Sequence, residues 1–470
     1  MTSTMAIILA TILVISATLI PTYLISKKQG TSEEDWAVAS RSLPIYVVIG
    51  TQFASAMGGG ILVGHVGNSF THGISTLIYG FLSCIVFFFI MIPAKWLRRN
   101  NFTTVPEILR SFSNQSKFVT IVAAVMTIVV PFGWVTSQIT AFGNIYTSLT
   151  GFDYKLLCLI FCVVSLLFVM PSGLKTVAWT DFIFACFMIF MCIISVFYVT
   201  NLSGGLDVVA QTVDPAMLTF KGSIESVGKV TVFLWIFSIL PGGLTNQLYF
   251  QRVCAADDEK SVNKSLAISA VLLMLAFAWS VYMGINIKAV NPGIEGSAAT
   301  GWFMAQLPLP LLAGFAALIF ATLMSTVSSG VQSVVVNITR DIVPFIKPGM
   351  TEEKTLRLSR ILSLVTIMVA LILCLYFSDT LGWLVTTYAF SAATLLCPIY
   401  VGYLARNKNF LTKEGIVASM IAGAVGCVVG MVLKTQINYA AIGIALSFIP
   451  LLVVSATTRK KESKEKNLSA

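Results

Sequence analysis

The chain has 470 residues, of which 57% are hydrophobic and only 11% are charged, with a formal net charge of +10. Soluble proteins carry about a quarter charged residues, so this composition excludes an ordinary soluble protein and indicates one that crosses the membrane many times. The nine cysteines show neither CxxC nor Cys/His metal spacing. We therefore interpret them as packing residues and predict neither a disulfide framework nor a metal–thiolate centre.

Windows of about 20 apolar residues mark candidate transmembrane helices. The first is too long for a signal-peptide core and is followed by no small-residue cleavage site, so we interpret it as a retained helix. The pattern predicts roughly thirteen spans: 5–26, 43–70, 73–97, 118–150, 154–171, 177–201, 229–251, 265–287, 308–338, 358–377, 381–404, 413–433 and 437–457.

The basic residues predict the orientation of these spans. Of the 30 lysines and arginines, 25 fall in loops on one side of the predicted membrane. Because basic loops stay in the cytoplasm, we expect an extracellular N-terminus and a cytoplasmic C-terminus in a cell (plasma or inner) membrane. The basic tail, residues 459–470, could contact anionic lipid.

Two predicted spans contain helix breakers. Gly58-Gly59-Gly60 interrupts the second span and Pro241-Gly242-Gly243 interrupts the seventh. Small residues can serve close helix packing, but freed backbone groups at membrane depth also line cavities. Spans two to six and seven to eleven form two sets of five, each beginning with a broken helix, as in the inverted repeats of secondary transporters. The predicted units are an extra helix and cytoplasmic loop (1–42), a first repeat (43–201), a second repeat (202–406), two further helices (407–458) and the tail (459–470).

A dense group of hydroxyls lies in the ninth span, in Ser-Thr-Val-Ser-Ser at residues 325–329. Ser325, Ser328 and Ser329 share one helical face, with Thr326 beside it. Serines in membrane helices can bond to their own backbone. Four hydroxyls together are also hard oxygen ligands, which suit a small hard cation such as sodium.

Charged and titratable residues are rare within the spans. Asp181 begins the sixth span, and an acid at membrane depth is a functional candidate, although it could instead cap the helix at the interface. We expect His65 and His72 to pack or to face water. Arg252 ends the broken seventh span, and we expect it to extend to the cytoplasmic interface.

Four separated motifs carry a family resemblance. They are residues 102–107 (FTTVPE), 173–181 (GLKTVAWTD), Asn246-Gln247 with Gln251-Arg252, and 321–329 (ATLMSTVSS) with Thr339-Arg340-Asp341. Over about residues 40–410 the chain resembles the sodium:solute symporter family, which includes proline, galactose and sialic acid symporters. The resemblance implies an all-α membrane fold of about thirteen helices. Its core would be a five-plus-five inverted repeat of the leucine-transporter type, with broken first and sixth core helices.

The resemblance also implies sodium sites. The first would use backbone carbonyls and two hydroxyls, from Ala54, Met57, Thr322, Ser325 and Thr326; Thr322 stands where the family usually has alanine. A second site would use Asp181, Ser325, Ser328 and Ser329.

A solute pocket near the two breaks is implied as well, with candidates Gln52, Ser55, Gly58, Gly59, Trp134, Gln138, Ser238, Asn246, Gln247, Tyr388 and Ser391. Glycine amides at the first break suit a small carboxylate. The aromatic faces of Trp134, Trp235 and Tyr388 suit a quaternary ammonium. The sequence does not decide between these substrates.

The expected function is sodium-coupled import of a small organic solute by alternating access, with Na⁺ as the coupling ion. No enzymatic activity, nucleic acid or obligate protein partner is implied. One alternative is a proton-coupled permease of the same fold, in which Asp181 would titrate. Another is a transporter-like membrane sensor, which would need a partner protein. An intramembrane enzyme is disfavoured, because HExxH, GxSxG and paired intramembrane acids are all absent.

Overall fold

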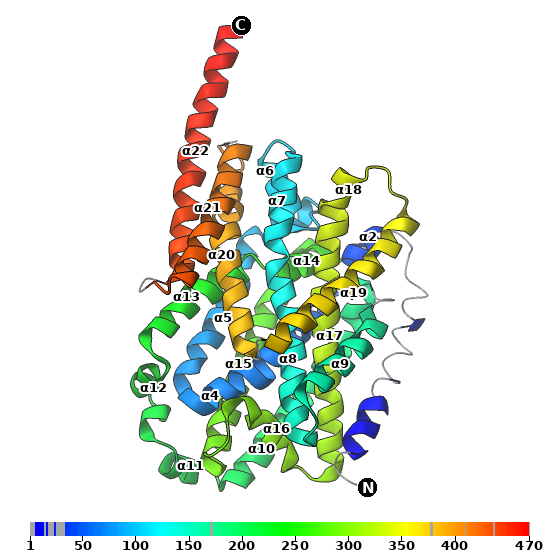
Figure 1. The fold of residues 1–470 in the computed structure, drawn as a ribbon, viewed down its shortest axis with the longest axis vertical. Coiled ribbons are helices and arrows are strands. Elements are labelled where there is room, and N and C mark those ends of the chain that lie inside the picture. Colours follow the sequence, from blue (N-terminus) through cyan, green and yellow to red (C-terminus); the bar gives the residue numbers. More distant parts are fainter. Residues whose placement is uncertain are drawn as a thin grey trace.

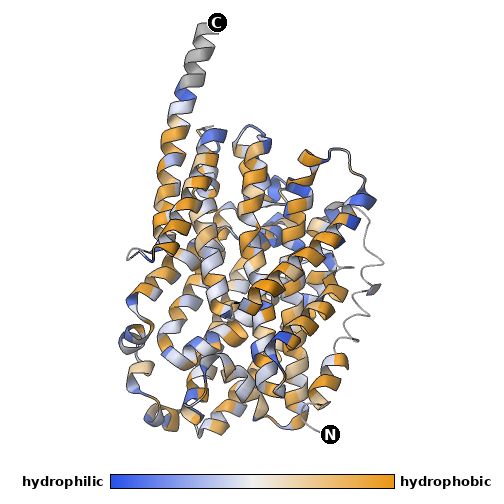
Figure 2. Ribbon diagram, in the orientation of Figure 1, coloured by the Kyte–Doolittle hydropathy of each residue, from blue (hydrophilic) through white to orange (hydrophobic). Residues whose placement is uncertain are grey.

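The computed structural model describes residues 5–13, 16, 23–24, 33–169, 173–376, 379–408, 410–435 and 438–469, and in this part the chain forms a bundle of helices (Figure 1). The bundle is built mainly of apolar helices, and hydrophobic residues make up much of their length (Figure 2). They are α5 (Leu77–Arg99), α7 (Lys117–Thr127), α8 (Val129–Thr150), α9 (Tyr154–Val169), α10 (Leu174–Ser203), α13 (Lys229–Gly243), α14 (Gln247–Ala255), α15 (Glu259–Val290), α17 (Leu309–Asp341), α19 (Glu352–Tyr376), α20 (Thr380–Leu404), α21 (Lys413–Val432) and α22 (Tyr439–Ser469).

Shorter helices complete the bundle. The first broken span consists of α3 (Ile45–Ala56), a π-helical turn η2 (Gly60–His65) and α4 (Val66–His72). The remaining short elements are α2 (Glu33–Val38), η1 (Ala39–Arg41), η3 (Ile74–Thr76), α6 (Val105–Phe112), α11 (Leu206–Thr212), η4 (Pro215–Leu218), α12 (Phe220–Val227), η5 (Gly296–Ala298), α16 (Ala299–Ala305) and α18 (Val343–Ile346).

The helices match the predicted spans from 43–70 onward. The described residues contain ten helical spans that are long and apolar enough to cross a membrane, and the bent pair can make an eleventh. One of the ten, Lys229–Ala255, consists of α13 and α14 together. Predicted span 118–150 is α7 and α8 together, and 154–171 contains the shorter α9. In span 5–26, residues 5–13, 16 and 23–24 are helical, and the remaining residues lie outside the described part of the chain. The all-α class is confirmed.

The first break lies where the glycines predict it. Helix α3 ends at Ala56, and the broken span bends by 49°. A Cβ on Gly58 would lie 2.5 Å from Oε1 of Gln138, and one on Gly59 would meet Ala141 of α8. The glycines therefore both interrupt the helix and let α8 approach the backbone. The two interpretations of the sequence, a helix break and close helix packing, are complementary.

The second break lies slightly beyond its predicted position. Pro241 and the two glycines form the last turn of α13, and the chain leaves the helix only at residues 244–246. Asn246 then caps α14, because its Oδ1 accepts a hydrogen bond of 3.0 Å from the Leu248 amide. Gly242 packs against the Tyr388 carbonyl of α20, where a Cβ would clash.

Helix α17 forms the centre of the bundle. Every residue from Ile319 to Asn337 is buried, and the helix packs against α3, α8, α9, α10 and α19. The hydroxyl cluster at residues 325–329 consequently faces other helices on every side and contacts no lipid.

Two helical glycines give a matched test of this packing. A Cβ on Gly423 of α21 would collide with the Ala393 carbonyl of α20, whereas one on Gly314 of α17 would have open space. We expect Gly423→Ala to lower the melting temperature in detergent by several degrees, because overpacking costs about 1–3 kcal/mol. Gly314→Ala should leave it unchanged or raise it. Equal melting temperatures for the two variants would contradict this α20–α21 contact.

Candidate ion and solute site

Backbone oxygens are available where α3 ends. The carbonyls of Ala54 and Met57 accept no hydrogen bond from any residue in the described part of the chain, because the helix stops before their usual donors. On α17, the Ser325 hydroxyl is buried and has no partner among the described residues. The Thr326 hydroxyl bonds to the Thr322 carbonyl of its own helix at 3.2 Å.

These two groups of oxygens lie on helices in contact. The Ser55 and Ser329 hydroxyls are 3.4 Å apart, and a Cβ on Gly59 would lie 3.2 Å from the Leu323 side chain. Along the chain, Met57 lies between Ser55 and Gly59, and Ser325 and Thr326 lie between Leu323 and Ser329. The residues expected for the first sodium site are therefore on facing elements.

A buried ion pair lies beside this segment. The Arg252 guanidinium is 3.6 Å from Oδ2 of Asp181, and the two side chains are 1% and 0% exposed. The Asp181 oxygen also accepts hydrogen bonds from the hydroxyls of Thr51 (2.6 Å) and Ser55 (3.1 Å). Arg252 in turn donates to Thr51 (3.0 Å), Ser55 (2.6 Å) and Ser329 (2.8 Å). One cluster thus links α3, α10, α14 and α17.

This cluster corrects two expectations. Arg252 does not extend to the cytoplasmic interface, because the neighbouring carboxylate and hydroxyls satisfy its charge inside the protein. Nor does Asp181 cap a helix at the interface: α10 begins after Gly173, and Asp181 lies two turns inside it.

Arg252 also engages part of the expected second sodium site. Ser329 accepts from the guanidinium, and Ser328 donates to the Met324 carbonyl of its own helix at 3.0 Å. Within the described structure, Oδ1 of Asp181 and the Ser325 hydroxyl have no hydrogen-bond partner. Two of the four expected oxygen donors are therefore free.

A small cavity adjoins the first break. Its volume is about 40 Å³, and no charged side chain is among the described residues that line it. Of the expected solute residues, five line it: Ser55, Gly58, Trp134, Gln138 and Tyr388. The others in its wall, which sequence reasoning missed, are Ala56, Gly60, Ile61, Tyr79, Ser83, Tyr249, Leu273, Phe277 and Leu384.

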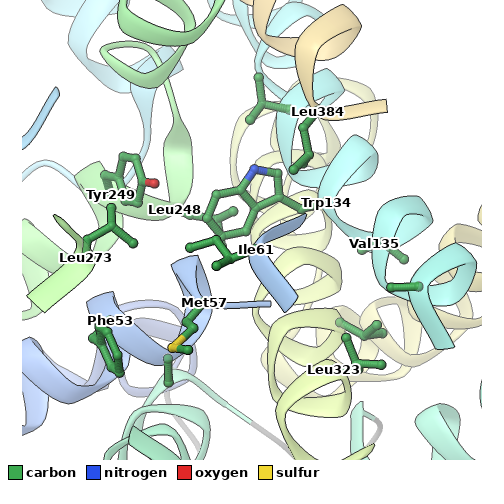
Figure 3. Close-up of a cluster of buried hydrophobic side chains, with 14 of the residues drawn as sticks. Phe53, Met57, Ile61, Trp134, Val135, Leu248, Tyr249, Leu273, Leu323 and Leu384 are labelled. Atoms are coloured by element: carbon green, nitrogen blue, oxygen red, sulfur yellow. The ribbon is translucent and has the colours of Figure 1, made fainter. Parts of the chain in front are cut away.

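Aromatic rings dominate this wall, and Trp134 lies between Tyr249 and Leu384, close to Ile61 (Figure 3). The Trp134 indole donates to the Tyr388 hydroxyl at 3.1 Å, and the Trp134 and Tyr249 rings are 5.9 Å apart, edge to face. Tyr249 lies between Gln247 and Gln251 of a motif noted in the sequence, which is the one signal that pointed toward it.

The remaining expected solute residues do not line this cavity. Gln52 accepts from Ser269 of α15 at 2.7 Å, and Ser391 pairs with Thr245 at 2.6 Å. Gln247 holds the loop before α6, donating to the Thr103 carbonyl at 3.1 Å. Gly59, Ser238 and Asn246 are also outside the lining.

A larger cavity of about 600 Å³ lies at the end of the bundle that carries α4 and η5. Glu295 and Asp379 are among its lining residues, and no lysine or arginine is among those described. Trp235 lines this larger cavity and Tyr79 lines the smaller one. Their rings pack edge to face with centroids 5.9 Å apart, so this pair separates the two cavities.

Hydrogen bonds join the elements at the opposite end, near α6 and α18 (Figure 1). Arg41 donates to the carbonyls of Asn101 (2.6 Å), Phe102 (3.1 Å) and Cys254 (3.1 Å). Further bonds connect Arg340 with Glu107 (2.7 Å) and Thr104 with Asp341 (3.0 Å). The motifs at residues 102–107 and 339–341 therefore hold this end together.

The histidines take part in neither cavity's chemistry. His65 is buried between the Ser280 hydroxyl (2.7 Å) and the Thr76 carbonyl (2.9 Å), so it packs as expected. His72 contacts the Ser226 hydroxyl at 2.9 Å at an exposed position.

Comparison with known proteins agrees with this architecture. The model of the sodium:solute symporter family matches residues 36–423, so the chain belongs to that family. It is 26% identical to the sodium/proline symporter of Salmonella typhimurium, over 84% of this chain and 82% of the relative. It is 23% identical to the sodium/pantothenate symporter of Escherichia coli, covering 86% of each.

A solved structure shares the fold. A Na⁺-coupled sialic acid symporter, described as revealing a novel Na⁺ site in a substrate-bound outward-open state, aligns with a TM-score of 0.81 at 16% identity. The alignment covers 96% of this chain and 98% of the other. The fold is therefore the leucine-transporter type with two broken core helices. The chain is a multi-pass membrane transporter of the sodium-coupled class, and its family members are transporters rather than enzymes.

The buried ion pair generates a stability prediction. Removing one partner of such a pair costs roughly 3–5 kcal/mol, because a charge is left uncompensated. We expect Asp181→Asn and Arg252→Gln each to lower the melting temperature strongly, and the double variant to lose less than the sum. Glu107→Gln removes the charge from the partly exposed pair with Arg340, whose side chains are 22% and 28% exposed, and should cost about 1 kcal/mol or less. Additive losses for Asp181 and Arg252 would refute the coupling.

Proposed function

We propose that this protein imports a small organic solute by alternating access, driven by sodium bound between the end of α3 and the hydroxyl cluster of α17. The observation that carries the proposal is the set of carbonyls at Ala54 and Met57, which have no donor among the described residues and face α17. Neutral oxygens of this kind replace a hydration shell yet release the ion. The ligands would be Ala54, Met57, Thr322, Ser325 and Thr326.

The two ends of the bundle support the same mechanism. One end carries the 600 Å³ cavity, and the other is held by the bonds of Arg41, Arg340 and Asp341. In alternating access, sodium and solute enter from the cavity end, and the bonded end then opens. Each charge moved inward yields about 2.3 kcal/mol per 100 mV of membrane potential. Sodium and solute favour the same state, so each raises the affinity for the other.

The basic residues support a direction. The bonded end carries Arg41, Arg98 and Arg340, and basic loops stay in the cytoplasm. We place this end in the cytoplasm, with the N-terminus outside and the C-terminus inside, in the plasma or inner membrane. The predicted repeats, 43–201 and 202–406, would be the units that rock against each other.

A second sodium ion would bind to Oδ1 of Asp181 and the Ser325 hydroxyl, the two expected donors without partners. The ion would compete with Arg252 for the carboxylate. Counting the sodium ions bound per chain with ²²Na⁺ distinguishes one from two.

Proton coupling is less well supported. Asp181 is the acid that a proton-coupled permease would use, and Arg252 and two hydroxyls already hold its carboxylate. Protonation of Asp181 would leave the buried Arg252 guanidinium without its charged partner, which is costly. Uptake driven by a pH gradient without sodium would favour this alternative.

The sodium ligands can be tested directly. We expect Ser325→Ala and Thr326→Ala to weaken ²²Na⁺ binding by purified protein at least tenfold, because each removes an oxygen ligand. Ser363→Ala is the matched control, since within the described structure that hydroxyl bonds to the Ser359 carbonyl of its own helix. Sodium binding that both site variants retain unchanged would exclude this site.

The coupling can be tested by thermal shift. Proline and pantothenate, the substrates in the relatives' names, are the first probes to add, with sodium chloride or choline chloride as the salt. A ligand at a hundred times its Kd stabilises by about 2.7 kcal/mol. We expect the solute that binds to stabilise only with sodium; stabilisation that is equal in choline chloride would contradict sodium coupling.

A further inference from the structure

The amide of Gln138 takes the place at the first break that the sequence assigns to a solute. Its Oε1 accepts a hydrogen bond of 2.6 Å from the Gly59 backbone N–H. Its Nε2 donates to the Trp134 carbonyl (3.2 Å) and to the Ser137 hydroxyl (3.0 Å), both on its own helix α8. The side chain is 2% exposed, so α8 holds the amide firmly against the break.

The glycines are required by this contact. A Cβ on Gly58 would lie 2.5 Å from Oε1 of Gln138, and one on Gly59 would lie 3.3 Å from it. The run of glycines therefore accommodates a side chain of the protein itself. Gly58 and Gly60, on either side of Gly59, line the solute cavity together with Gln138.

Binding of a solute requires a side chain to move. The cavity of about 40 Å³ holds no more than a few water molecules, since each needs about 10–15 Å³ of such space. The Ser55 hydroxyl accepts a hydrogen bond from Arg252, and the Trp134 indole donates one to the Tyr388 hydroxyl. Gln138 differs from these two, because it accepts its hydrogen bond from a backbone amide of the break itself, that of Gly59.

Gly59 also adjoins the ion donors. The Cβ position that touches Gln138 on one side lies 3.2 Å from Leu323 of α17 on the other. Leu323 directly follows Thr322, and Gly59 is two residues beyond Met57. Thr322 and Met57 are both expected sodium ligands. A change at the Gly59 amide thus reaches both halves of the sodium site.

We propose that Gln138 couples the solute cavity to the sodium site, holding the Gly59 amide until a carboxylate or carbonyl oxygen of the solute replaces its own oxygen there. This deepens the proposed function and rests on it. It makes Gln138 a specificity-determining residue that selects solutes with an oxygen acceptor. It also makes the shape of the Met57–Gly59 turn, and so the affinity for sodium, depend on which oxygen is bound.

Equilibrium ²²Na⁺ binding without solute tests this. Gln138→Leu removes the acceptor from a buried N–H, so we expect the sodium Kd to rise about fivefold or more. Gln138→Glu, measured at pH 8, keeps an acceptor and adds a negative charge near the ion, so the Kd should fall. Ser137→Ala removes one anchor and leaves the Gly59 contact, so its Kd should stay within twofold.

The outcomes are distinguishable. Size-exclusion profiles and melting temperatures establish that each variant is folded, and Gln138→Met replaces the leucine variant if that one is not. Suppose that the wild-type protein binds sodium, but the Kd is unchanged in the leucine and glutamate variants or shifts in the same direction in both. That result overturns the role of Gln138 and leaves the proposed function standing. A wild-type protein that binds no sodium overturns the proposed function as well.

Discussion

The structure depends on the buried contact between Arg252 and Asp181. Two opposite charges with almost no exposure persist at membrane depth only because each is paired and hydrogen-bonded. The hydroxyls of Thr51, Ser55 and Ser329 supply those bonds, so the ion pair ties both broken spans to α10 and α17. The elements that would have to move against one another during transport are thereby joined at one point.

Close approach of backbones is the second constraint. At the first break, Gly58 and Gly59 admit Gln138 and Ala141 of α8 and Leu323 of α17. At the second, Gly242 admits the Tyr388 carbonyl of α20. A helix interrupted at such a point leaves backbone oxygens without donors, and the same packing places those oxygens opposite the hydroxyls of α17. The proposed sodium ligands and the close helix packing therefore arise from the same local geometry.

Sequence reasoning predicted the described spans well because hydropathy is local: about 20 apolar residues are needed whatever their neighbours are. The first break was also predicted, because the signal of its three glycines is local in the sequence. The second was misplaced by a few residues, because the end of α13 is decided by the Asn246 cap and by the contact of Gly242 with α20. Ser55, Trp134 and Tyr388 were expected in the solute pocket and do line the cavity, whereas Tyr79 and Phe277 had no signal, since their spans show only apolar character.

By itself, the sequence determined the membrane class, the positions of the described spans from residue 43 onward, the location of the first break and the hydroxyl-rich face of α17. All of these follow from composition and spacing within one segment. Tertiary structure alone decided that Arg252 turns inward to Asp181, that Gln247 serves the α6 loop rather than the cavity, and that the Gln138 amide caps Gly59. The partners in these contacts are 71, 144 and 79 residues apart along the chain, so no local pattern records them. The cost of leaving a buried polar group unpaired selects them only once the helices are packed.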